Sequence, residues 1–260
     1  MTETKFAGAF LFRLRSWRRL LRFAGHATVA VLSPSTYSPA TRAVAVRQIY
    51  FTAWQILLGY TLFAALFSLV LIEIVTATAR QYGLSQHALE LILRVLVLEL
   101  IPLLTALFVA LRSGAAIGAE VALMRVSGQI EDLEEAGESP LHGEFVPRIA
   151  AAALSVASLT TLSCALALWL AYVVIYGFSP WGYAEYTRIV GNVFDVPGLA
   201  GFALKCLLFG MAVALIPIAT GLEAERGKIK SVPVAVLGGL VKLFFVIGLI
   251  EVVSLVVKYI

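Results

Sequence analysis

The chain has 260 residues, of which 60% are hydrophobic and only 14% are charged. This balance excludes an ordinary soluble domain, in which about 25% of residues are charged. A net charge of +4 is compatible with nucleic-acid binding, but the basic residues follow the ends of apolar segments, and we expect no nucleic-acid partner. The composition predicts a polytopic membrane protein.

The first predicted element is an amphipathic helix near the N-terminus. Its two faces on a helical wheel are Phe6, Phe10, Leu14, Trp17 and Leu21 on one side, and Arg15, Arg18, Arg19 and Arg22 on the other. We expect this helix to lie on the membrane with its arginines toward anionic headgroups, and the alternative is a cytoplasmic helix packed on a partner. It lacks the pattern of a cleaved signal, so we expect it in the mature protein. Pro34 and Pro39 then end it, and residues 1–49 form a helix plus linker.

Five apolar segments follow, each long enough to cross about 30 Å of hydrocarbon at about 20 residues. They lie near residues 50–76, 91–111, 149–176, 201–220 and 232–257. Residues 50–260 therefore form the transmembrane domain. The expected fold class is an all-α membrane protein with an N-terminal interfacial helix and five transmembrane helices. The loop at residues 177–200 carries several aromatic residues, which suit a short helix at the membrane interface.

Lysines and arginines indicate the orientation of these spans. If the N-terminus is inside, the cytoplasmic side receives the N-terminal arginines and the basic residues of the second and fourth loops. The outside then receives only Arg80, Arg94, Arg188 and Lys258. The positive-inside rule predicts a cytoplasmic N-terminus, a periplasmic C-terminus and a cytoplasmic segment between the second and third spans.

This segment between the second and third spans is charged and helix-forming. We expect the second span to break into a turn at residues 112–114, and a charged arm to occupy residues 113–147. Ile130 and Leu133 share one helical face, whereas the remaining positions are acidic: Glu131, Asp132, Glu134, Glu135 and Glu138. Gly137 should end the helix and Pro140 should prevent its continuation. The alternative is a solvated loop that only connects two spans.

The sequence contains none of the common catalytic motifs. HExxH, CxxC and GxSxG are absent, and the three histidines lie far apart, so we expect no metal site. Residues 221–229, GLEAERGKI, resemble a phosphate-binding loop but have one residue too many between the glycines and Ile229 in place of Ser or Thr. We expect this chain not to be an enzyme and to hold no cofactor. Cys164 and Cys206 lie in apolar runs and should be buried thiols.

Ionisable residues inside predicted spans each cost about 2.5 to 3.5 kcal/mol on insertion scales, and two of them are the main candidates for function. Glu99 precedes Pro102 in the second span, and Lys205 lies in the fourth. One hypothesis is that they line a cavity and contact a phospholipid headgroup. The other is that they pair with each other or with backbone and hold helices together. Glu73, Lys242 and Glu251 are weaker candidates, and the last two face opposite sides of one helix.

An ordered set of residues in the 95–148 region resembles the permease subunits of the MlaE (YrbE) family. It comprises Glu99, Leu100, Pro102, Leu103, Leu104, Thr105, Arg112, Ser113, Gly114, Ala119, Glu120, Met124, Ile130, Glu131, Asp132, Leu133, Gly137, Pro140, Val146, Pro147 and Arg148. Outside it, Arg80 to Gly83, Lys205 and Gly221 also fit. These permeases are the membrane half of lipid-handling ABC transporters that work with MCE-domain proteins.

The resemblance implies an inner-membrane homodimer that moves phospholipids and maintains outer-membrane lipid asymmetry. Its partners would be an ATPase subunit, which holds ATP and Mg, and a periplasmic MCE-domain lipid-binding protein. Glu99, Leu103 and Lys205 would contact the lipid. The arm would be a cytoplasmic coupling helix that contacts the ATPase through Glu120, Ile130, Glu131, Asp132, Leu133, Glu134, Gly137 and Pro140.

The sequence also departs from the family pattern. Leu98 stands where an arginine is often found, and Glu251 replaces an Asp-Phe pair as the only carboxylate there. Ser139 and Glu144 differ from the usual residues around Pro140. These departures leave open a pairing with a diverged sibling instead of a second copy. A non-transporting membrane scaffold and a small-solute carrier are the alternative functions.

Overall fold

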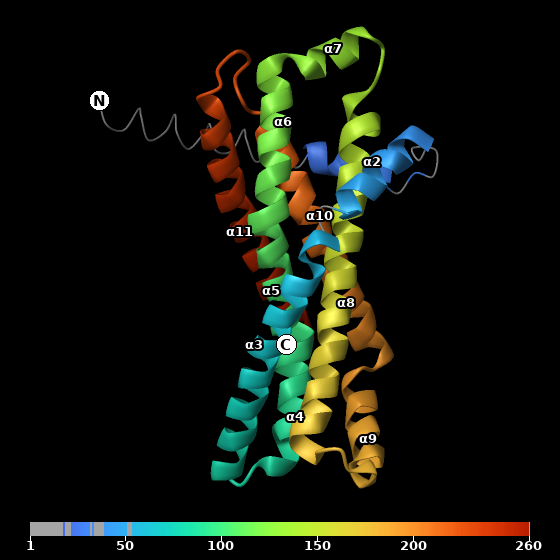
Figure 1. Cartoon of the computed structure of the whole chain (residues 1–260), viewed down its shortest axis with the longest axis vertical. Helices are drawn as coiled ribbons and strands as arrows, with labels where there is room; N and C mark the ends of the chain where they lie inside the picture. The colour runs from blue at the N-terminus through green and yellow to red at the C-terminus, as the bar shows by residue number, and fades with distance from the viewer. Residues whose placement is uncertain (1–17, 19–21, 32, 34–38, 51–53, 260) are drawn as a thin grey trace, which may run out of the picture. The chain divides into compact units, whose positions relative to one another are not determined.

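The computed structural model describes residues 18, 22–31, 33, 39–50 and 54–259 (Figure 1). Every regular element among them is a helix, which agrees with the predicted all-α class. The α-helices are α2 (Pro39–Ile49), α3 (Gln55–Gln81), α4 (Ala88–Leu91), α5 (Ile101–Val109), α6 (Ala115–Ser127), α7 (Gln129–Glu135), α8 (Val146–Tyr176), α9 (Tyr183–Val193), α10 (Val196–Gly221) and α11 (Ser231–Tyr259). Short 3₁₀ turns are η3 (Ser85–His87) and η7 (Pro180–Gly182), and π-helical stretches are η4 (Ile92–Leu100), η5 (Ala110–Gly114) and η6 (Leu141–Phe145).

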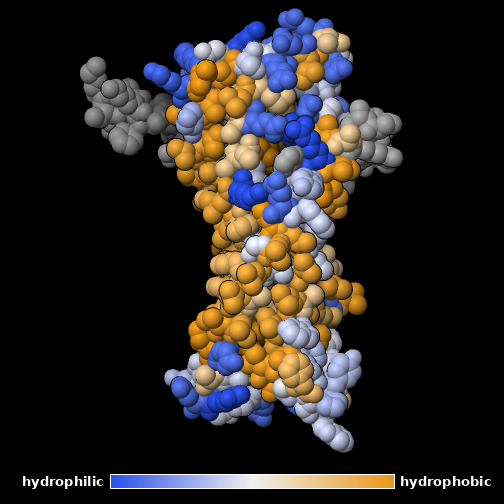
Figure 2. Space-filling view, in the orientation of Figure 1, coloured by the Kyte–Doolittle hydropathy of each residue, from blue (hydrophilic) through white to orange (hydrophobic). Residues whose placement is uncertain are grey.

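In the described part of the chain, five helical segments are long and apolar enough to cross a membrane. They are Gln55–Gln81, Ser85–Ser127, Leu141–Tyr176, Val196–Gly221 and Ser231–Lys258, so the predicted number of spans is confirmed. The exposed sides of α3 and α11 carry large apolar residues such as Leu58, Leu62, Val234 and Val241. Apolar side chains likewise dominate the visible surface of the spans in Figure 2, and hydrophilic ones gather near helix ends. Lipid tails are the solvent that suits such a surface.

The second span does not break at residues 112–114, and this prediction is wrong. The helix passes through η5 into α6 and ends only at Ser127. Gly114 has helical dihedral angles, and a methyl group added to it would lie 3.2 Å from the carbonyl oxygen of Val213. Small residues here allow α10 to approach closely, as they do between many membrane helices. The small residues at this point of the sequence therefore indicate close packing against α10 and not a turn.

The chain divides into two compact units, and α8, α10 and α11 contribute residues to both. Unit 1 consists of described residues within Met1–Gln48, Ala110–Ala152 and Met211–Phe245. Unit 2 consists of described residues within Ile49–Val109, Ala153–Gly210 and Val246–Ile260. Each unit has its own buried apolar cluster.

The core of unit 1 is built from close helix contacts. Ile117, Val121 and Ile149 are buried in it, and Gly118 and Gly221 allow α6 and α10 to touch. A methyl group on Gly221 would lie 2.9 Å from the carbonyl oxygen of Gly118. The helical residues 22–31 also pack here, with Ala27 fully buried.

The predicted N-terminal amphipathic helix is therefore only partly within the described residues. Arg18 and Arg22 are exposed, as expected of its basic face. Phe6, Phe10, Leu14, Trp17, Leu21, Arg15 and Arg19 lie outside the described residues. Helix α2 was not predicted from the sequence. Its first residue is Pro39, which suits the first helical position because its missing N–H is not needed there.

Unit 2 packs α3, η4, α8 and α9 around a second apolar cluster. Elsewhere in unit 2 the hydroxyls of Tyr60 and Thr105 are 2.6 Å apart, and within the cluster the Cys164 thiol donates to the carbonyl of Val97. Both cysteines are buried and free, as predicted.

The short helix predicted between residues 177 and 200 is confirmed as α9. Tyr186 anchors it, because its hydroxyl donates to the carbonyl oxygen of Leu168 at 2.9 Å. Burial raises the pKa of Tyr186 to about 12. Trp181, just before α9, is 93% exposed.

Candidate functional site

Four charged side chains meet inside unit 2. Glu99 comes from η4, Lys205 from α10, and both Glu251 and Lys258 from α11. Glu251 and Lys258 are seven positions apart and therefore lie on one face of α11, two turns from each other. The three helices bring together residues that are far apart in the sequence.

The four groups form a continuous chain of ion pairs. Lys205 donates to Glu99 and lies 2.7 Å from a carboxylate oxygen of Glu251. Lys258 donates to the other oxygen of Glu99 at 2.7 Å. Glu99 is thus shared by two ammonium groups, and Lys205 is shared by two carboxylates. The pairing of Glu99 with Lys205, one of the two hypotheses for these residues, is present.

Three members of the ion cluster are deeply buried, and the cluster is electrically balanced. The side chain of Lys205 is 3% exposed, that of Glu99 9% and that of Glu251 12%. Two carboxylates and two ammonium groups sum to zero charge, which is the condition under which buried charges are tolerated. Truncating one member leaves its partner charged in a poorly hydrated environment, and this is costlier than losing an exposed pair.

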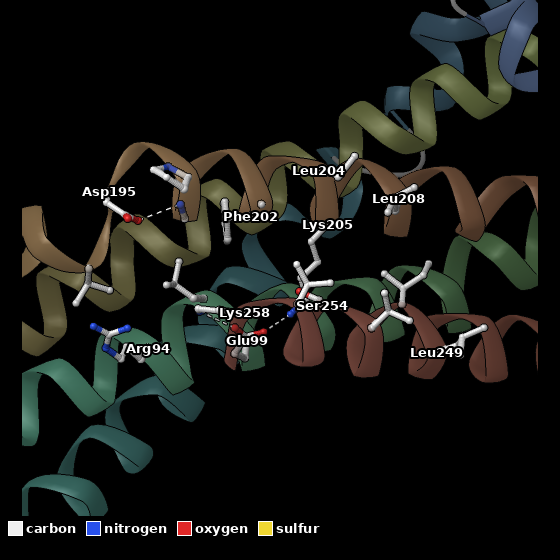
Figure 3. A pocket seen from close by; sticks show the side chains of 18 of the residues that line it. Arg94, Glu99, Asp195, Phe202, Leu204, Lys205, Leu208, Leu249, Ser254 and Lys258 are labelled. Atoms are coloured by element: carbon white, nitrogen blue, oxygen red, sulfur yellow. Dashed lines mark hydrogen bonds and ion pairs between the residues drawn. The ribbon is translucent and has the colours of Figure 1, made fainter. Parts of the chain in front are cut away.

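A cavity of about 680 Å³ lies beside this cluster in unit 2 (Figure 3). Glu99, Lys205 and Lys258 line it, and Figure 3 shows Glu99 between the two lysines. The remaining wall is mostly apolar and includes Leu98, Phe202, Leu204, Leu208, Leu249, Ile250, Val253 and Val257. Ligand cavities have volumes of about 300 to 1,000 Å³ and combine such walls with a few polar groups. Both hypotheses for Glu99 and Lys205 therefore agree with the geometry at once: the residues pair, and they line a cavity.

The cavity has further polar groups at the end where Figure 3 shows Arg94 and Asp195. Arg94 donates to Glu90 at 2.9 Å, one turn earlier in the same span. Asp195 accepts from the backbone N–H of Gly198 at 2.9 Å. Leu103, the third residue predicted to contact lipid, is half-buried and does not line this cavity.

The acidic arm of unit 1 contains a helix, α7, but its apolar face is already occupied. Ile130 is 4% exposed and Leu133 is half-buried, and both pack on the core of unit 1. The side that remains exposed is acidic and consists of Asp132, Glu134, Glu135 and Glu138. The exposed surface that α7 and its C-terminal turn offer to a partner is therefore mainly acidic.

The end of α7 follows the sequence prediction. Gly137 has a φ of +79°, which favours glycine, and its N–H donates to the carbonyl of Glu134. The N–H of Glu138 donates to the carbonyl of Leu133, so the two bonds form a Schellman motif. Pro140 is buried and precedes η6.

Ion pairs connect the arm to the spans within unit 1. Arg148 lies 3.1 Å from Glu120 and 2.8 Å from Glu144, and its side chain is 9% exposed. Arg125 pairs with Glu131. Glu120 and Glu131, both predicted to contact the ATPase, thus hold the arm to its own chain.

Comparison with known proteins gives the family. The family model of the permease MlaE matches residues 45–257. The chain belongs to the MlaE permease family.

Individual relatives match about half of this chain. A probable ABC transporter permease protein from Synechocystis sp. is 32% identical over 134 residues, 50% of this chain and 49% of its own length. The Haemophilus influenzae intermembrane phospholipid transport system permease protein MlaE is 30% identical over 138 residues, 52% of each chain. A probable ABC transporter permease protein from Rickettsia typhi is 30% identical over 132 residues, 50% of each chain. The chain spans about half the length of the curated relatives it matches.

Two members of the ion cluster, Glu251 and Lys258, were not among the main candidates predicted from the sequence. Glu251 was a weak candidate and Lys258 was counted only as a basic residue outside the membrane. The i, i+7 spacing of an acid and a base was the available signal, since it places both on one side of a helix. Nothing in the sequence showed that this side faces Glu99 and Lys205.

The described part of the chain contains no group of three or more His, Cys, Asp or Glu side chains arranged to hold a metal ion.

Proposed function

We propose that this MlaE permease is the transmembrane subunit of an ABC transporter that moves phospholipids between the inner membrane and a periplasmic MCE-domain protein. The observation that carries this proposal is the cavity in unit 2, with a charged cluster on one side and mostly apolar residues on the rest. A phospholipid has a charged headgroup and apolar chains, and this lining is complementary to both. The relative from Haemophilus influenzae, which is named as an intermembrane phospholipid transport permease, supports the same substrate class.

The N-terminus lies in the cytoplasm and the C-terminus in the periplasm in this proposal, as the distribution of Lys and Arg predicts. A separate subunit binds ATP and Mg and hydrolyses ATP, and it contacts the cytoplasmic helix α7. Because Ile130 and Leu133 pack on unit 1, the contact uses the exposed acidic side of α7. The matching surface on the ATPase would be basic. A second copy or a diverged sibling completes the permease, and the transport maintains outer-membrane lipid asymmetry.

Reconstitution tests the transport function. The permease, its ATPase subunit and the MCE-domain protein are placed in vesicles with a fluorescent phospholipid, and its transfer to the MCE-domain protein is followed. We expect transfer that requires ATP and that falls at least tenfold in the Glu99→Ala variant. ATP hydrolysis without any lipid transfer would contradict the proposal and would favour the scaffold.

Copurification tests the role of α7. We expect the triple variant Asp132→Lys, Glu134→Lys, Glu135→Lys to insert normally and to lose the ATPase subunit, because its exposed charge is reversed. Glu185→Lys on α9 is the matched control, since it changes an exposed acid of unit 2. Recovery of the ATPase at the wild-type ratio with the triple variant would overturn this assignment.

A further inference from the structure

The two lysines of the ion cluster have different surroundings. Lys205 lies between the carboxylates of Glu99 and Glu251, and its side chain is 3% exposed. Lys258 lies in the last turn of α11 and its side chain is 25% exposed. Both line the cavity, but an incoming group reaches Lys258 with much less rearrangement.

We infer that Lys258 is the residue of this cavity that contacts the phosphate of the lipid headgroup, and that it exchanges Glu99 for the phosphate when lipid enters. This inference rests on the proposed function and adds the residue that recognises the substrate. The ligand chemistry is a phosphate diester that carries one negative charge.

The charge balance favours Lys258 over Lys205 for this exchange. If Lys258 turns to a phosphate, Glu99 keeps Lys205 as its partner. If Lys205 turned away, Glu251 would lose the ammonium group 2.7 Å from it while 12% exposed. Leaving a buried charge without a partner is strongly unfavourable. Lys205 therefore holds the helices together, and Lys258 is the lysine that can be released.

The position and chemistry of Lys258 also suit this role. An ammonium group on a flexible four-carbon chain can follow a ligand over several ångströms, and hydrogen bonds between ionised groups are the strong ones. Arg94 lines the same cavity and carries a second positive charge. The apolar walls formed by Leu204, Leu208 and Val253 are available to the acyl chains.

Lipid binding by the purified full-length protein in detergent tests the inference. Affinities are measured for fluorescent phosphatidylglycerol and for diacylglycerol with the same acyl chains, with inorganic phosphate as a competitor. The variants are Lys258→Gln, Lys258→Arg and Lys242→Gln. Lys242 is the matched control because it is also a lysine of α11 paired with a glutamate, Glu223, but lies in unit 1 and does not line the cavity.

We expect Lys258→Gln to weaken phosphatidylglycerol binding about tenfold, the size expected for one charge-assisted hydrogen bond. Binding of diacylglycerol should stay within about twofold, since it has no phosphate to lose. Lys258→Arg should keep most of the phosphatidylglycerol affinity, Lys242→Gln should match the wild type, and inorganic phosphate should compete poorly.

Three results would overturn the inference. Unchanged phosphatidylglycerol binding by Lys258→Gln shows that Lys258 does not contact the phosphate. Equal loss of both lipids, with a lowered melting temperature that Lys258→Arg does not restore, shows a structural role only. Strong competition by inorganic phosphate shows a site for free phosphate. If the wild type binds neither lipid, the proposed function itself fails, and this outcome is distinct from the other three.

Discussion

The two units use similar ion pairs in different ways, and α11 carries an example of each. Lys242 in unit 1 pairs with Glu223 at 3.2 Å, and both side chains keep more than a fifth of their surface exposed. Lys258 in unit 2 joins a cluster in which Glu99 and Lys205 are almost fully buried. Only the cluster in unit 2 borders the cavity described above. A charge in an apolar segment is therefore a candidate for function when burial, sharing of partners and a cavity coincide.

The ion pairs of the two units should also differ in how much they contribute to the free energy of unfolding. Breaking a buried pair by removing one partner costs about 3 to 5 kcal/mol, whereas exposed pairs are worth about 0.2 to 1 kcal/mol. If the comparison is correct, substitutions of the buried cluster members Glu99, Lys205 and Glu251 destabilise the protein far more than those at the ion pairs of unit 1.

The largest effect is expected for Lys205→Ala, at about 3 to 5 kcal/mol of unfolding free energy. The variant leaves Glu251 without its ammonium neighbour and gives the cluster a negative charge. Unfolding in mixed detergent and sodium dodecyl sulfate measures the change. The double variant Lys205→Ala, Glu251→Gln restores neutrality and should recover at least about 1 kcal/mol relative to additivity. Strict additivity would show that the two groups do not interact.

The second largest loss of unfolding free energy is expected at a close helix contact in unit 2. A methyl group on Gly210 would lie 2.5 Å from the Cα of Ala153, and this contact is with backbone. Gly210→Ala should therefore cost about 1 to 3 kcal/mol, as overpacking does. Gly59→Ala in α3 meets nothing within 4 Å and should be neutral or slightly stabilising in the same unfolding assay. Equal melting temperatures for the two variants would disprove the close contact.

A smaller loss is expected for Arg148→Ala in unit 1, at about 1.5 kcal/mol, the value for one hydrogen bond to a charged group. Arg148 itself is buried, but Glu120 and Glu144 are exposed enough to be hydrated when it is gone. The same unfolding titration measures it. A loss as large as that of Lys205→Ala would remove the distinction between the two units.

Lys242→Gln should have the smallest effect, below about 1 kcal/mol, because its pair with Glu223 is partly exposed. Raising the salt concentration should weaken the difference between this variant and the wild type further, since salt screens exposed charges. A salt-independent loss of several kcal/mol would place Lys242 with the buried cluster instead.

The sequence was sufficient for the fold class because long apolar segments have few alternatives in a membrane. The number of spans, the helix α9 and the end of α7 at Gly137 all followed from local composition. The supposed break at residues 112–114 was wrong because small residues have two uses, turns and close helix contacts, and only the position of α10 decides between them.

The site was only partly predictable for a similar reason. Burial costs identified Glu99 and Lys205, which lie within clear spans. Lys258 was assigned to the aqueous side because it directly follows the last predicted span, 232–257, but its long side chain reaches back to Glu99. The orientation of Ile130 and Leu133 toward unit 1 also depends on tertiary packing that the helical pattern of α7 does not contain.

The central claim is that the cavity beside Glu99 and Lys205 holds a phospholipid, and native mass spectrometry of bound lipid tests it most directly. Gly201 lines the cavity and has open space around it, so the Gly201→Trp side chain should fill the cavity. Gly248 on α11 also has open space around it but does not line the cavity, so Gly248→Trp is the control. The account predicts that the wild type and Gly248→Trp retain phospholipid after purification and that Gly201→Trp loses it. Equal phospholipid occupancy in all three proteins would contradict it.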